Sequence, residues 1–122
     1  MENNKDYTKE LVKTALSALD NKKAEDIKIL DISEISTIAD YFIIAGGNSK
    51  PHVQTLCDEV LDQVAKLGGV NKKTEGYETA NWVLMDFNDV IVHIFDKENR
   101  LFYDLERIWK DVKSMDISEF GI

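Results

Sequence analysis

The chain has 122 residues and a formal net charge of −8, because 15 lysine and arginine residues stand against 23 aspartate and glutamate residues. This length fits one domain, and 43% hydrophobic with 31% charged residues is ordinary for a soluble globular protein. The acidic balance disfavours direct binding to DNA or RNA, which needs a basic surface to displace counterions from phosphates. A basic protein partner fits the charge better, although many acidic proteins are acidic only for solubility.

The sequence also indicates a compartment. Its single cysteine, Cys57, excludes an internal disulfide and suits a reducing environment. No apolar run approaches the ~20 residues of a membrane span, and the segment from Met1 to Lys13 is charged throughout, unlike a signal peptide. We therefore expect a cytoplasmic protein without membrane contact.

The first half of the chain predicts two helices and two strands. Apolar residues spaced by three and four predict an amphipathic helix over 7–21. Residues 27–32 predict a strand, and the uninterrupted apolar run 41–45 predicts a central strand buried on both faces. A second helix is expected to be capped by Ser49 and to run to about Leu67.

The second half predicts a short edge strand over 71–76 and then a β-hairpin over 82–95. The hairpin is expected to turn at Asn88-Asp89, because these residue types tolerate the positive φ of a tight turn. Such a turn would pair Phe87 with Val90, Met85 with Val92, and Val83 with Ile94. A final helix is predicted over 100–109.

The order of these elements predicts one α/β domain over residues 1–112. We expect a mixed sheet of four or five strands with helices mainly on one face. Residues 113–122 are expected to form a frayed C-terminal tail.

The two faces of the predicted hairpin differ in composition. One face carries only the six apolar residues of the three predicted pairs and belongs against a core. The opposite face, which we call the mixed face, carries Trp82, Leu84, Asp86, Ile91, His93 and Phe95. Its aromatic groups are costly to leave in water, whereas its aspartate and histidine are costly to bury unpaired. A partner that covers this face resolves both costs.

The sequence offers no convincing catalytic carboxylates. The glycine turn Gly46-Gly47 between a strand and a helix could attract a phosphate, but it lacks the lysine and spacing of a P-loop and does not match the dinucleotide fingerprint. Nucleotidyltransferases open with a similar turn and then hold metal ions with paired carboxylates spaced two apart on a strand. Here Asp58 and Glu59 are adjacent on a helix, and Asp86 and Asp89 flank a turn.

The two histidines and the cysteine are equally weak candidates. His52 lies in the first turn of its helix, where a hydrogen bond to the preceding loop is the simplest interpretation. For His93, contact with a partner and a local hydrogen bond to Asp86 both stay open. Cys57 is most simply a small core residue. We therefore expect no catalytic residue, no metal site and no cofactor.

Several short segments are weak indicators of a family one by one, but their order and spacing together are specific. They are 21–27 with Leu30-Asp31, 38–45, Ser49 and His52, Glu75-Gly76, the hairpin 82–95 and the helix 100–109. Together they resemble the ribosomal silencing factor family, also called Iojap-like proteins, over about Ala15 to Asp111. Two departures, Phe87-Asn88 for the more usual Tyr-Gly and Gly47 for a common Thr or Ser, do not touch the mixed face.

The resemblance implies a nucleotidyltransferase-like fold that has lost its catalytic carboxylates, and an activity without catalysis. It implies binding to the large ribosomal subunit through the ribosomal protein numbered fourteen. Such binding would block joining of the small subunit and repress translation when nutrients are limiting. The implied partner is basic, as most ribosomal proteins are, and a homodimer is compatible with the family.

On this resemblance we expect the partner-binding residues to form three groups: an apolar centre, acidic groups that face basic residues, and hydrogen-bonding groups around the centre. They are Trp82, Leu84 and Phe95; Asp86, Asp104 and Glu106; and His93, Arg100 and Tyr103. The alternatives are a large-subunit assembly or maturation factor, an active nucleotidyltransferase, and an interaction module whose mixed face forms a homodimer.

Overall fold

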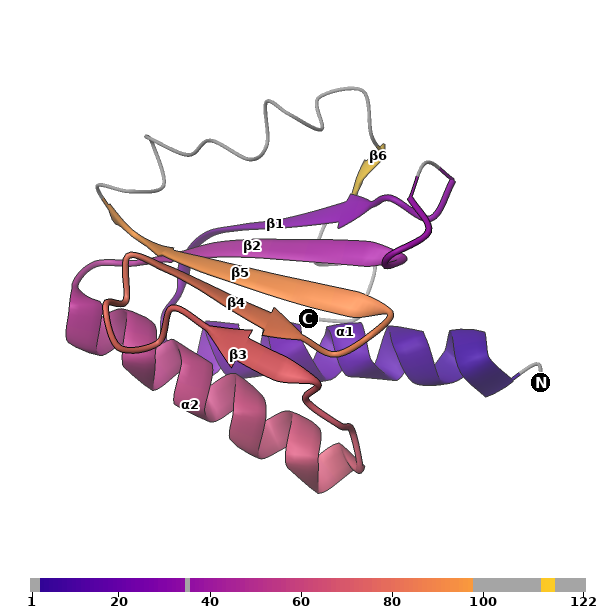
Figure 1. Cartoon of the computed structure of the whole chain (residues 1–122), viewed down its shortest axis with the longest axis horizontal. Helices are drawn as coiled ribbons and strands as arrows, with labels where there is room; N and C mark the ends of the chain where they lie inside the picture. The colour runs from indigo at the N-terminus through magenta and orange to yellow at the C-terminus, as the bar shows by residue number, and fades with distance from the viewer. Residues whose placement is uncertain (1–2, 35, 98–112, 116–122) are drawn as a thin grey trace.

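The structure is a computed structural model that describes residues 3–34, 36–97 and 113–115. Its helices and strands are α1 (Asn3–Asn21), β1 (Glu25–Asp31), β2 (Tyr41–Gly47), α2 (Lys50–Leu67), β3 (Lys73–Glu75), β4 (Trp82–Asp86), β5 (Val90–Asp96) and β6 (Lys113–Met115). The strands form one six-stranded sheet in the order β3-β4-β5-β2-β1-β6. Both helices pack on the same side of this sheet (Figure 1). None of the described helices has the length and apolar character needed to cross a membrane.

The sheet is mixed, because β2 and β5 pair in parallel at its centre while the other neighbours are antiparallel. The predicted α/β class, with a mixed sheet and helices on one face, is confirmed. Among the described residues the sheet has six strands, where four or five were expected. Residues 113–115, which we expected in a frayed tail, form β6 and pair with β1. The remaining tail residues, 116–122, and the predicted helix over 100–109 lie outside the described residues.

The predicted hairpin forms in the predicted register. Val83 lies opposite Ile94 and Met85 opposite Val92, and the Phe87 N–H donates to the Val90 carbonyl at 2.9 Å. At the turn, Asn88 adopts a φ of 78°, as expected for a residue type that tolerates the left-handed region.

The main core lies between the sheet and the two helices. It contains the inward residues of the hairpin together with the apolar faces of both helices, and its α2 members are Val53, Leu56, Cys57, Val60 and Val64. Leu61, also on α2, is partly buried and packs against this core. Burial is the main reason that the pKa of the Cys57 thiol is raised to about 12, so the thiol stays protonated and acts as a small apolar residue.

Helix α2 begins and ends as the sequence predicts. The Ser49 hydroxyl accepts a hydrogen bond from the His52 N–H at 3.2 Å, and Gly68 ends the helix with a φ of 93°. The His52 side chain accepts from the Asn48 N–H at 2.9 Å and contacts the Lys22 carbonyl at 2.7 Å. The interpretation of His52 as a loop-binding residue is therefore confirmed.

Gly47 is needed for close packing between β2 and α2. A Cβ atom at Gly47 would lie 2.7 Å from Cγ2 of Val53, a separation that no real Cβ contact tolerates. This contact is a sufficient reason for glycine at position 47. The second glycine of the turn therefore does not need to be explained by phosphate binding.

Candidate partner-binding face

The side of the hairpin that faces away from the helices is the candidate site. We call it the outer face, and it consists of Trp82, Leu84 and Asp86 on β4 with Ile91, His93 and Phe95 on β5. Side chains alternate along a strand, so these residues point away from the helix-covered core. A second apolar cluster forms here, in which residues of β1 and β2 and the loop between them pack beside Ile91 and Phe95, with Trp82 and Leu84 at its margin. In Figure 1 this side of the sheet lies above the strands, opposite α1 and α2.

The two strands of the outer face differ in exposure. Trp82, Leu84 and Asp86 on β4 are half-buried, so an approaching protein can contact them. On β5, only 4% of His93 and 1% of Phe95 are exposed. The expectation that these two residues contact a partner directly does not fit this burial. The reason is position, because β5 lies between β4 and β2, whereas β4 is followed only by the short edge strand β3.

Trp82 is held by two aromatic neighbours on β5. Its indole N–H donates to Nδ1 of His93 at 3.1 Å, and its ring stacks on Phe95 with centroids 5.4 Å apart and an interplanar angle of 21°. His93 also makes an edge contact with Phe42 at a centroid distance of 4.7 Å. Offset aromatic contacts of this kind add about 1 kcal/mol each beyond area burial. Trp82 is therefore presented in one orientation.

His93 is a neutral, buried hydrogen-bond acceptor. Because its Nδ1 accepts the indole proton, the ring proton of the neutral form resides on Nε2. Nε2 is buried, and none of the described residues forms a hydrogen bond with it. Burial lowers the pKa of His93 from 6.5 to about 4. Of the two interpretations left open by the sequence, the structure gives a local hydrogen bond, but to Trp82 and not to Asp86. Leaving Nε2 unsatisfied costs about 1–3 kcal/mol.

Asp86 serves the hairpin turn with one carboxylate oxygen. Its Oδ1 accepts from the Asn88 N–H at 2.8 Å, and its backbone carbonyl accepts from the Lys72 N–H at 2.7 Å. A role of the half-buried carboxylate in binding a basic partner stays a prediction. The other predicted partner-binding residues lie outside the described residues; they are Arg100, Tyr103, Asp104 and Glu106.

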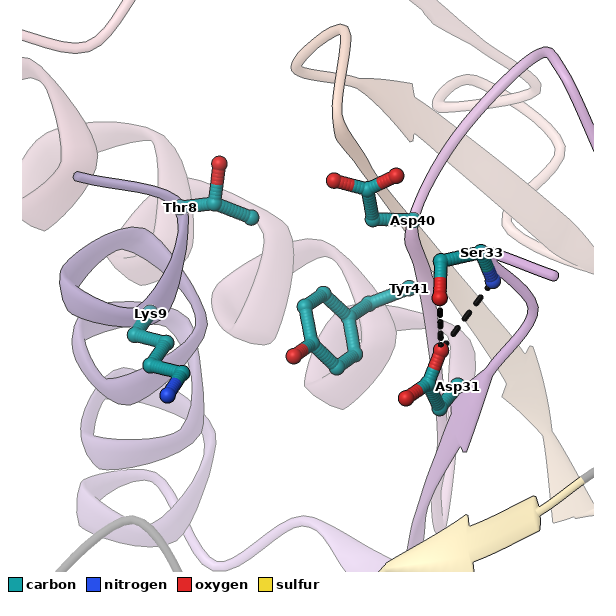
Figure 2. A pocket seen from close by; sticks show the side chains of 6 residues that line it. All are labelled: Thr8, Lys9, Asp31, Ser33, Asp40 and Tyr41. Carbon is teal, nitrogen blue, oxygen red and sulfur yellow. Dashed lines mark hydrogen bonds between the residues drawn. The ribbon is translucent and has the colours of Figure 1, made fainter. Parts of the chain in front are cut away.

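A cavity of about 290 Å³ lies elsewhere, between α1 and the loop that joins β1 to β2. Its lining residues are Thr8, Lys9, Asp31, Ser33, Asp40 and Tyr41. Figure 2 shows the Tyr41 ring between α1 and Asp31. Burial, with Asp31 and Asp40 nearby, raises the pKa of Tyr41. Asp31 and the segment 38–45 belong to the segments that carry the family resemblance, but their sequence predicted no site at this place.

The chemistry of this cavity is limited. The Ser33 hydroxyl donates to Oδ1 of Asp31 at 2.6 Å, and the Ser33 N–H donates to the same oxygen at 3.0 Å. A serine bound only to a carboxylate lacks the histidine-type base that activates a nucleophile. Within residues 3–34, 36–97 and 113–115, no three histidine, cysteine or acidic residues gather as metal ligands would.

Comparison with known proteins decides the family. The family model described as "Ribosomal silencing factor during starvation" matches residues 5–121. This chain belongs to the ribosomal silencing factor family. The description is that of a regulatory factor and not of an enzyme.

Members and relatives of the silencing factor family show how far the similarity extends. The chain is 46% identical over 114 residues to "Ribosomal silencing factor RsfS" of Bacillus subtilis, covering 93% of this chain and 96% of that protein. A crystal structure from Bacillus halodurans is 40% identical and superposes with a TM-score of 0.79 over 88% of this chain and 97% of that chain. A more distant relative, the mouse "Mitochondrial assembly of ribosomal large subunit protein 1", is 27% identical over 97 residues, covering 77% of this chain and 42% of that protein.

In this silencing factor family member, Gly76 sets the backbone position of Trp82. Gly76 has a φ of 84°, and a Cβ atom there would overlap the carbonyl oxygen of Trp82. Only glycine adopts this conformation without strain. Glycine in the family segment Glu75-Gly76 therefore allows the backbone to pass close to Trp82, the first residue of β4.

We expect Gly76→Ala to destabilise the protein by about 2 kcal/mol, because it adds a backbone overlap to an unfavourable positive φ. Chemical denaturation monitored by circular dichroism measures this loss. Gly68→Ala is the matched control, since Gly68 also has a positive φ but its Cβ would meet nothing within 4 Å. Equal losses for the two variants would show that the contact with Trp82 contributes nothing.

Proposed function

We propose that this protein binds the large ribosomal subunit through the ribosomal protein numbered fourteen and sterically blocks joining of the small subunit. Translation is thereby repressed when nutrients are limiting. The factor acts in the cytoplasm by occupying part of the subunit interface, and no covalent bond is made or broken. The observation that carries this proposal is the half-exposed indole of Trp82, held rigidly on the outer face of an acidic member of the silencing factor family.

The geometry of Trp82 supports a docking role. Interfaces draw most of their binding energy from a few buried anchors, among which tryptophan is enriched. An anchor that is already fixed in the free protein loses little side-chain entropy on binding. Trp82 meets both conditions, because it is partly accessible and is held by His93 and Phe95. Leu84 extends the apolar centre along β4.

The charge of the chain supports a basic partner. A net charge of −8 attracts a basic ribosomal protein and disfavours the phosphates of ribosomal RNA. Acidic groups at the edge of an interface increase the association rate and fix orientation more than they increase affinity. We assign this role to Asp86 and, beyond the described residues, to Asp104 and Glu106.

Co-sedimentation with purified ribosomal subunits tests the proposal. The protein should pellet with large subunits and remain in the supernatant with small subunits alone. Adding small subunits to the preformed complex should then give fewer joined ribosomes than large subunits without the factor. Protein that stays in the supernatant, or subunits that join normally while the factor is bound, would contradict the proposal.

A second candidate function is assembly or maturation of the large subunit. The printed name of the mouse relative, which refers to assembly of a mitochondrial large subunit, favours it. Cells that lack the factor distinguish the two functions. Accumulation of precursor particles supports assembly, whereas failure to restrain translation under nutrient limitation supports silencing.

Self-association is compatible with either function. Measuring the molecular size of the free protein, and then of the complex with large subunits, shows whether a dimer exists and whether it separates on binding. Measurable binding of a nucleotide with magnesium would instead favour the nucleotidyltransferase alternative.

A further inference from the structure

We propose that His93 is a positioning residue for docking, which orients the indole of Trp82 and removes its N–H from contact with the partner. The ribosomal group that packs on Trp82 then meets an aromatic ring and not a hydrogen-bond donor. This inference rests on the proposed function, because it concerns the same surface. It replaces the expected direct contact between His93 and a partner with an indirect role.

The hydrogen bond between Trp82 and His93 runs from the indole N–H to the imidazole. Indole has a single N–H and no acceptor, and in Trp82 this N–H points at Nδ1 of His93 at 3.1 Å. The donor is therefore used within the protein. A partner gains no hydrogen bond from Trp82 unless the bond to His93 is broken first.

Phe95 and His93 constrain the Trp82 ring in different ways. Phe95 stacks nearly parallel to the indole, with an interplanar angle of 21°, and such a contact fixes the plane of the ring. Stacking alone does not distinguish the ring from one turned by about 180° about the Cβ–Cγ bond, which lies in the same plane but places the N–H at the opposite edge. The hydrogen bond to His93 is directional, so it selects the orientation in which the N–H faces His93.

His93 does more than fill space in the core of the outer face. The residue is 4% exposed and lies opposite Leu84 in the β4–β5 register, a position where an aliphatic side chain would pack well. Instead the position holds a ring whose buried Nε2 has no hydrogen-bond partner in the described part of the chain. A buried unsatisfied polar atom calls for an explanation, and the acceptor that His93 offers to Trp82 supplies one.

Two substitutions separate positioning from packing. His93→Leu keeps an apolar group of similar size but removes the acceptor. His93→Asn places an oxygen close to the position of Nδ1 and restores the acceptor. Both are made in a Trp109→Phe background, which leaves Trp82 as the only tryptophan of a chain that has two. Ile94→Val, on the same strand but on the face that packs in the helix-covered core, controls for a general change in β5.

Two measurements are made on each variant: hydrogen exchange of the Trp82 indole N–H by NMR, and affinity for purified large subunits. His93→Leu should speed indole exchange roughly tenfold and weaken subunit binding roughly fivefold, the loss expected for one hydrogen bond. His93→Asn should recover most of both values. Ile94→Val should leave both within about twofold of the parent.

The outcomes separate this inference from the proposed function. If Trp82→Ala weakens subunit binding but His93→Leu alters neither indole exchange nor affinity, positioning by His93 is wrong and docking through Trp82 stands. If Trp82→Ala binds subunits normally, the docking proposal fails and the inference fails with it. If His93→Leu does not fold, indole exchange in the parent protein decides, because an N–H that exchanges as fast as free indole overturns the inference.

Discussion

Trp82→Ala should weaken binding to the large subunit by roughly 2 kcal/mol, or about thirtyfold, while the domain stays folded. The reason is that the indole is the largest half-exposed group on the outer face and is fixed before binding. The substitution removes the anchor and also uncovers Phe95. Titration of labelled protein with large subunits measures the affinity, and circular dichroism checks the fold.

Two further variants sharpen this result. Val70→Ala truncates an apolar residue that is 71% exposed and lies outside the outer face, so its affinity should stay within about twofold of wild type. Trp82→Phe keeps an aromatic ring and should retain part of the affinity. Wild-type affinity in Trp82→Ala would show that the docking face has been misassigned.

Local patterns were sufficient to predict the hairpin. Alternating apolar residues and a turn at Asn88-Asp89 are short-range features, and they gave the observed pairs, such as Met85 with Val92. The cap at Ser49 and the stop at Gly68 are equally local. The family followed from the order of several such segments, which the family match confirms.

The exposure of the outer face could not be predicted in the same way. Which side chains are accessible depends on the strand next to β5, and that strand is β2, paired in parallel from Tyr41 opposite Val90 onward. This pairing joins segments far apart in the sequence. It is the reason that Phe95 and His93 are buried while Trp82 is half-buried.

The partner of His93 and the strand β6 were missed for related reasons. Pairing across the hairpin places Leu84 opposite His93, so the bond to Trp82 runs diagonally to the opposite strand. Diagonal neighbours come into reach only for long or aromatic side chains. Strand β6 has three residues and no clear periodicity, and its pairing with β1 is again a long-range contact.

Acidification should destabilise the protein through His93, by up to about 3 kcal/mol. The pKa of His93 is lowered by burial from 6.5 in the unfolded chain to about 4 in the folded protein. Above pH 6.5 the imidazole is neutral in both states, and its full contribution to stability is present. As the pH falls from 6.5 to 4, the unfolded chain takes up a proton that the folded protein does not, so stability is lost over this window.

Urea denaturation at a series of pH values between 7 and 4 measures this loss. The matched variant is His93→Asn, which does not titrate in the window but keeps an acceptor for the Trp82 indole. Carboxyl groups titrate in both proteins, so the difference between their unfolding free energies isolates the histidine. This difference should grow as the pH falls below 6.5 and level off near pH 4, and parallel curves for the two proteins would mean that His93 is not held neutral by burial. Because protonation of Nδ1 also removes the acceptor for the indole, the emission of Trp82 in the Trp109→Phe background should change over the lower part of the same window.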